Sequence, residues 1–118
     1  MKNLERDKGL VADLLDTIRL IKGYVPTTKD ELMRDILKQD AILMRLQLTG
    51  ELMRCQSDSM RERYPDLPWK QAVGLRNIIA HEYGAVDLER VWNLLQPGGD
   101  FYRFAARIEE IAQELGVE

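Results

Sequence analysis

The chain has 118 residues, of which 45% are hydrophobic and 31% charged, and its formal net charge at pH 7 is -3. This length predicts one domain, residues 1–118, with a core that needs no disulfide or metal, and the acidic balance excludes nucleic-acid binding by a broadly basic surface. Because the chain has one cysteine, no charged-then-apolar leader and no apolar run near the roughly 18 residues of a membrane span, we expect a cytoplasmic protein without membrane contact.

The N-terminal third predicts one long helix and one short one. Over residues 3–23, apolar side chains recur at steps of three and four, which is the pattern of an amphipathic helix that ends at Gly23. Pro26 indicates a turn, because proline biases the residue before it away from helical angles. Thr28 is then placed to cap a short helix over residues 29–35.

The longest predicted helix covers residues 37–63, and apolar residues form two stripes along it. One stripe contains Leu37, Ala41, Met44, Leu48, Leu52 and Cys55, and the other contains Ile36, Leu43, Leu46, Gly50 and Met53. A helix that is apolar over so much of its circumference is buried on several sides. It therefore lies at the centre of a bundle, or part of it faces another subunit. Cys55 is expected to be a packed thiol in this helix.

The second half predicts three further helices. Pro68 is expected to be the first residue of a helix over 68–82, and Gly84 to end that helix in the left-handed conformation. Asp87 and Asp100 are expected to be the N-caps of the two helices that follow. No stretch alternates as a strand does. We therefore predict an all-α fold, an antiparallel bundle of four principal helices with one or two short extra ones.

Polar side chains that can carry chemistry are concentrated in the 68–82 helix and just after it. Asn77 and His81 are four residues apart and share a face, while Arg76 lies on a neighbouring stripe from which its long side chain can reach the imidazole. Tyr83 would point away on a continued helix, but a helix that ends near it can re-aim the phenol. A single histidine is, by itself, more often a hydrogen-bonded structural residue than a catalyst.

The segment that contains these residues resembles the HepT-like group of HEPN ribonuclease toxins. That group is marked by Arg-x4-His-x-Tyr, which this chain matches at Arg76, His81 and Tyr83, with a polar residue, Asn77, after the arginine. The resemblance extends over about residues 5 to 112 and implies the same helical fold. Other short segments that resemble the family are Pro68-Trp69-Lys70, Gln39-Asp40-Ala41, Gly50-Glu51 and Arg63-Tyr64-Pro65.

The resemblance implies an endoribonuclease toxin, and the residues fit RNA cleavage without a cofactor. One histidine and one cysteine do not supply a metal-ligand set, and no nucleophile for a serine triad is evident. In metal-independent cleavage the ribose 2′-hydroxyl is the nucleophile, His81 can exchange protons near neutral pH, and Arg76 can stabilise charge on the phosphate. Asn77 is a supporting residue that orients the imidazole or the phosphate.

One imidazole per chain leaves the second proton role open. A symmetric homodimer solves this, because it brings the same patch from two subunits together. The family resemblance implies such a composite Arg/His site at a homodimer interface, in an assembly that can extend to a higher oligomer.

The resemblance also implies a partner, a minimal nucleotidyltransferase antitoxin that transfers AMP to Tyr83. An alternative for Tyr83 is a structural role, with the ring packed on Arg76. The main alternative for the whole protein is a non-catalytic helical binding module, in which Arg76 and His81 are buried structural groups. A regulatory subunit of a nucleotidyltransferase is a third possibility.

Overall fold

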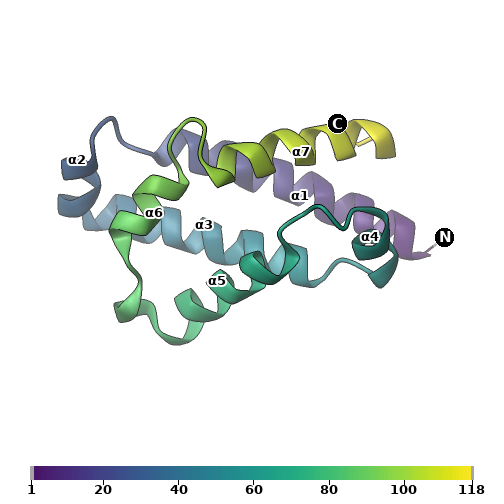
Figure 1. Cartoon of the computed structure of the whole chain (residues 1–118), viewed down its shortest axis with the longest axis horizontal. Helices are drawn as coiled ribbons and strands as arrows, with labels where there is room; N and C mark the ends of the chain where they lie inside the picture. Colours follow the sequence, from purple (N-terminus) through teal and green to yellow (C-terminus); the bar gives the residue numbers. More distant parts are fainter. Residues whose placement is uncertain (1, 118) are drawn as a thin grey trace.

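Four long helices form the frame of the molecule: α1 (Lys2–Tyr24), α3 (Ile36–Arg54), α5 (Trp69–His81) and α7 (Asp100–Leu115) (Figure 1). The computed structural model describes residues 2–117 and contains no strand in that range, so the all-α prediction is confirmed. The shorter elements are α2 (Lys29–Arg34), α4 (Asp58–Arg63), α6 (Leu88–Leu94) and a 3-10 turn, η1 (Tyr83–Ala85). Within the same range, no helix is long and apolar enough to cross a bilayer.

Helix α3 is the central element, because it packs against α5 on one side and α1 on the other, while α7 runs along α1 (Figure 1). Its predicted second stripe is largely buried, with Met53 fully enclosed. The other end of α3 is different. Ile36 is 69% exposed, Leu37 is 79% exposed and Met44 is 63% exposed. Thus only part of this helix is covered by the bundle, and its N-terminal half carries apolar side chains on the surface.

The predicted single helix over residues 37–63 is wrong, because α3 ends at Arg54 and a separate helix, α4, begins at Asp58. Ser57 caps α4, and its side chain accepts a hydrogen bond from the backbone N–H of Met60. The buried carboxylate of Asp7 on α1 in turn accepts bonds from the Ser57 backbone N–H at 3.0 Å and hydroxyl at 2.5 Å. A contact from a distant helix therefore fixes the break.

Capping follows the predictions for two helices and departs from them for two others. Thr28 and Asp87 are the N-caps of α2 and α6, and their side chains accept hydrogen bonds from first-turn backbone N–H groups. Pro68 is the N-cap residue of α5 and not its first helical residue. Likewise Gly99 caps α7, and Asp100 lies in the first turn, where a carboxylate is favoured by the helix dipole.

The crossing of α3 and α5 depends on Gly50. A Cβ atom at this position would lie 2.5 Å from the carbonyl oxygen of Ala72 and against the side chain of Arg76. Only a residue without a side chain allows the two backbones to approach so closely. Gly50 therefore sets the distance between α3 and the part of α5 that carries Arg76.

We predict that Gly50→Ala destabilises the protein by about 1–2 kcal/mol, because overpacking outweighs the gain in helix propensity. The obstruction includes the backbone carbonyl of Ala72, so α5 must shift to relieve it. The control is Gly9→Ala on α1, where an added Cβ meets no atom within 4 Å and about 0.5–1 kcal/mol of stabilisation is expected. Urea unfolding measures both. Equal stabilisation by the two substitutions would contradict the close approach.

Candidate active site

The end of α5 determines where the polar residues of the motif point. Helix α5 ends at His81, and the following residue, Glu82, leaves helical geometry at φ -137° and ψ 46°. Gly84 was expected to end the helix in the left-handed conformation, but it does not adopt a positive φ, so that expectation is wrong. The chain instead turns at Glu82 into the 3-10 turn η1. This turn re-aims the phenol of Tyr83, as predicted, but toward Asp40 on α3 and not into a cluster with Arg76 and His81.

The Tyr83 hydroxyl donates a hydrogen bond to the carboxylate of Asp40 on α3. This bond favours the neutral phenol, and with partial desolvation it raises the pKa of Tyr83 to about 12. The Tyr83 side chain is nevertheless accessible, since 47% of the residue is exposed. The contact ties the segment after α5 to α3, and it places an exposed tyrosine next to a carboxylate.

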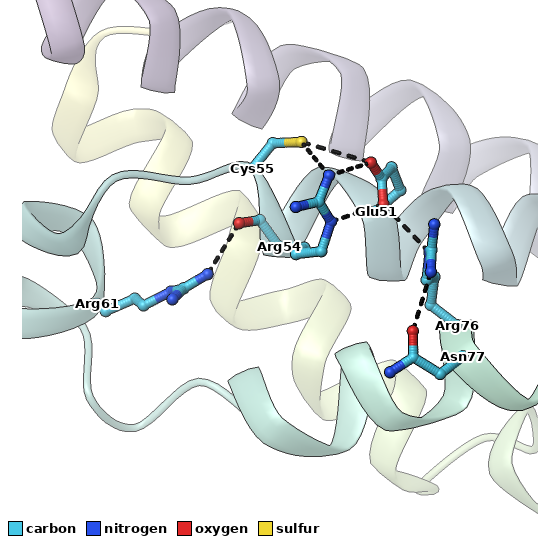
Figure 2. A network of polar contacts seen from close by, with 6 residues as sticks. All are labelled: Glu51, Arg54, Cys55, Arg61, Arg76 and Asn77. Carbon is cyan, nitrogen blue, oxygen red and sulfur yellow. Dashed lines mark hydrogen bonds and ion pairs between the residues drawn. The ribbon is translucent and has the colours of Figure 1, made fainter.

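Arg76 is turned toward α3, where its Nε atom lies 3.2 Å from Oε1 of Glu51 (Figure 2). The alignment of this ion pair is poor for a hydrogen bond, and the Nε atom is buried without one. On the other side, Nη1 of Arg76 donates to Oδ1 of Asn77 at 2.9 Å. Asn77 therefore contacts Arg76 and makes no hydrogen bond to His81. These two contacts hold the guanidinium between the helices.

Glu51 is shared between two arginines. Arg54 donates to it from Nε at 2.9 Å and from Nη2 at 2.6 Å, in the bidentate geometry that guanidinium and carboxylate favour. The hydrogen bonds from Arg54 are the main reason that the pKa of Glu51 is lowered to about 2, and the charge of Arg76 contributes. Glu51 is thus a fixed anion at neutral pH. The half-buried thiol of Cys55 lies 3.7 Å from the same carboxylate, at the C-cap of α3.

His81 is the last residue of α5, and its side chain is exposed. Among residues 2–117 the imidazole has no hydrogen-bond partner, either from Arg76 or from Asn77. The fold thus places Arg76 and Asn77 in one contact group with Glu51, Tyr83 in a second with Asp40, and His81 on the open surface at the end of α5. A substrate or a second protein copy has direct access to the imidazole.

Two acidic residues of this region, Asp40 and Glu51, were not assigned any role from the sequence. Both lie in phrases that resemble the family, but nothing in their local pattern shows which side chains they contact. Asp40 and Tyr83 are 43 positions apart in the chain. Only the packing of α3 against α5 and η1 brings such residues together.

A cavity of about 740 Å³ lies between α3, the first turns of α5 and α7. Apolar side chains dominate its lining, among them Leu46, Leu75 and Phe101. Arg76, His81 and Tyr83 do not line it. This cavity and the polar motif are therefore separate features of the fold.

Comparison with known proteins agrees with the motif. The model of the family described as "Ribonuclease HepT-like" matches residues 14–111. A "Putative RNase" of Methanocaldococcus jannaschii is 32% identical over 75% of this chain and 85% of its own length. A "Gamma-glutamylcyclotransferase and putative RNase" of the same organism is 30% identical over 86% of this chain but only 46% of its own.

The "Probable ribonuclease HepT" of Thermococcus cleftensis is 24% identical over 75% of this chain and 82% of its own length. No solved structure matches the chain.

Proposed function

Because the chain belongs to the Ribonuclease HepT-like family, we propose that it is the toxin of a toxin–antitoxin pair and acts as a metal-independent endoribonuclease. The observation that carries this proposal is that Arg76, whose guanidinium is held between two helices, lies on the same helix as an exposed imidazole, His81. The first supplies a fixed positive charge, and the second supplies a group that exchanges protons near neutral pH.

In the proposed reaction the 2′-oxygen of a ribose attacks the adjacent phosphorus, and the bond from phosphorus to the 5′-oxygen breaks. One group removes the proton of the 2′-hydroxyl, another protonates the leaving 5′-oxygen, and the product is a 2′,3′-cyclic phosphate. His81 takes one of these proton roles. Arg76 stabilises the negative charge that develops on the phosphate oxygens. Asn77 acts through Arg76, because its amide oxygen holds the guanidinium.

A second copy of the chain supplies the remaining proton role in this proposal. The exposed apolar residues Leu37 and Met44 flank Asp40 at steps of three and four along α3, so they share a face with it. Through Asp40 this apolar face reaches Tyr83 and the end of α5. Exposed apolar patches of this kind mark interaction surfaces, and an isologous contact here brings both copies of His81 to one groove.

We further propose that the partner is a minimal nucleotidyltransferase antitoxin that transfers AMP to Tyr83. The phenol oxygen attacks the α-phosphorus of ATP, pyrophosphate leaves, and the phenolic proton passes to the carboxylate that already accepts it, Asp40. Exposure of Tyr83 supports this assignment, since Tyr64 is buried and Tyr24 and Tyr102 are half-buried. Attached AMP adds bulk and negative charge where an RNA phosphate must bind.

The alternative of a non-catalytic binding module, or a regulatory partner of a nucleotidyltransferase, requires Arg76 and His81 to be structural groups. Exposure of His81, without a partner among residues 2–117, argues against a structural role for the imidazole. Growth on expression separates the two functions. A toxin arrests growth and a binding module does not.

We predict that the purified protein cleaves labelled single-stranded RNA in EDTA and leaves 2′,3′-cyclic phosphate ends. His81→Ala should lower the rate at least about 100-fold, the usual size of a lost proton-transfer role, and should leave the helical circular dichroism unchanged because the side chain is exposed. The control is Gln113→Ala, at an exposed position on α7. A rate for His81→Ala close to that of the control would remove the nuclease assignment.

We predict that Leu37→Asp combined with Met44→Asp converts a dimer to a monomer in sedimentation velocity and abolishes cleavage. Both side chains are mostly exposed in the single chain, so the changes spare its core and place like charges across a two-fold contact. Leu20→Asp on α1, where the native residue is 38% exposed, is the control and should remain dimeric. Cleavage by a wild-type monomer would contradict the composite site.

Coexpression with the antitoxin is expected to increase the mass of the protein by multiples of AMP, located at Tyr83 by peptide fragmentation. Tyr83→Phe should abolish the increase and Tyr102→Phe should not. Asp40→Asn should slow the transfer, since the amide cannot take the proton. Protein that is neutralised yet carries no AMP would show that the antitoxin acts by binding alone.

A further inference from the structure

Three arginines from separate segments gather on one side of α3 and α5. Arg61 of α4 donates from Nη2 to the backbone carbonyl oxygen of Arg54 at 2.8 Å, and Arg54 and Arg76 both contact the carboxylate of Glu51. Figure 2 shows them in the order Arg61, Arg54, Arg76 along the line from α4 to α5. The group is therefore continuous with the arginine of the proposed active site.

The charge of this group is positive although the chain as a whole is acidic. Two of the three guanidiniums, those of Arg54 and Arg76, share one carboxylate, Glu51, whose lowered pKa keeps it ionised. Among residues 2–117, Arg61 makes no ion pair with an acidic side chain, and its guanidinium lies 5.6 Å from the ring centre of Trp69. A chain with a net charge of -3 must bind a polyanion through a local group of cations.

The guanidiniums retain free donors. Arg54 donates to Glu51 from Nε and Nη2, and Arg76 donates to Asn77 from Nη1 while its buried Nε is ion-paired with Glu51. Nη1 of Arg54 and Nη2 of Arg76 therefore have no hydrogen-bond partner within the described part of the chain. Within residues 2–117, Arg61 donates only from Nη2, so its Nη1 is also without a partner, whereas its Nε atom is buried. The Arg54 side chain is 51% exposed, which leaves it open to a ligand.

The backbone contacts of this group hold it in place before any ligand arrives. The Trp69 ring under Arg61 is fixed by a hydrogen bond from its Nε1 to the carbonyl oxygen of Tyr64 at 2.9 Å. Arg61 is held by that ring and by the C-terminal carbonyl of α3, and Arg54 is held by Glu51. Side chains that are already ordered lose less entropy when they bind.

We propose that Arg54 and Arg61 bind the RNA backbone next to the phosphate that Arg76 contacts, so that the three arginines form one phosphate track. This inference rests on the proposed function, in which Arg76 contacts the scissile phosphate. Single-stranded RNA carries a phosphate at every nucleotide, and a strand held at Arg76 must continue across the adjoining surface. RNA is favoured over an acidic peptide because the row is continuous with Arg76, the residue that the proposed function places on the scissile phosphate.

Fluorescence anisotropy with a labelled single-stranded RNA oligonucleotide tests the track, in a His81→Ala background that prevents cleavage. Arg54→Gln combined with Arg61→Gln should weaken binding about 10-fold or more and lower the slope of log K against log salt by about 0.7 for each charge removed. The matched control removes the same charge elsewhere. It combines Arg19→Gln on α1 with Arg103→Gln on α7, both largely exposed, and should change binding less than about 2-fold.

Glu51→Gln should change the RNA affinity in the opposite direction. It removes the carboxylate that Arg54 and Arg76 share and should tighten RNA binding if these residues contact phosphates. The charge-retaining pair Arg54→Lys and Arg61→Lys should preserve most of the salt dependence. If the double glutamine variant fails to fold by circular dichroism, Arg54→Gln alone, at a side chain that is 51% exposed, should lower the slope by about 0.7.

Three outcomes decide between the possibilities. Equal RNA affinity of the Arg54/Arg61 variant and the Arg19/Arg103 control overturns the track. The nuclease proposal still stands in that case if the protein with His81 intact cleaves RNA. Loss of antitoxin binding with unchanged RNA affinity overturns the track in favour of a protein ligand. If the Arg54/Arg61 variant binds RNA more weakly but the protein with His81 intact cleaves no RNA, the track is supported and the nuclease proposal is wrong.

Discussion

The close packing of α3 against α5 at Gly50 is the constraint on which the polar region depends. Because position 50 has no side chain, the backbone of α5 at Ala72 and the stem of Arg76 lie directly against α3. One helical position further along α3, Glu51 then meets the Arg76 guanidinium at 3.2 Å. A larger separation of the two helices would leave this arginine as a mobile surface charge. The close crossing of α3 and α5 thus fixes the position of Arg76.

The balance between the carboxylate of Glu51 and the nearby arginines decides how much positive charge this region retains. A guanidinium close to a carboxylate is partly neutralised, which reduces its attraction for a phosphate. Here one carboxylate is divided between Arg54 and Arg76, and Arg61 adds a further charge without an acidic partner among residues 2–117. The arrangement keeps Arg76 oriented while the group as a whole stays positive. A protein of net negative charge can in this way direct a polyanion to one place on its surface.

The contact between Tyr83 and Asp40 links three features that we propose act together. It lies at the end of the motif helix, its phenol is accessible, and Asp40 shares a face of α3 with the exposed side chains of Leu37 and Met44. A modification at Tyr83 would therefore alter both the surface next to His81 and the apolar face proposed for a second copy. The apolar cavity between α3, α5 and α7 lies outside this arrangement.

The sequence by itself determined the helical class, the family motif and the caps at Thr28 and Asp87, because periodicity and capping depend on residues within a few positions of one another. It also indicated that the phenol of Tyr83 is re-aimed after α5, although the turn occurs at Glu82 without a left-handed Gly84. Tertiary structure alone decided that Asp7 contacts Ser57 in the break between α3 and α4, and that α3 is exposed at Leu37 and Met44. It alone also made Glu51 and Asp40 the partners of Arg76 and Tyr83. Each of these contacts depends on which helix faces pack together although they are far apart in the chain. The packing is selected by burial of apolar area over the whole molecule, so no local stretch of sequence indicates it.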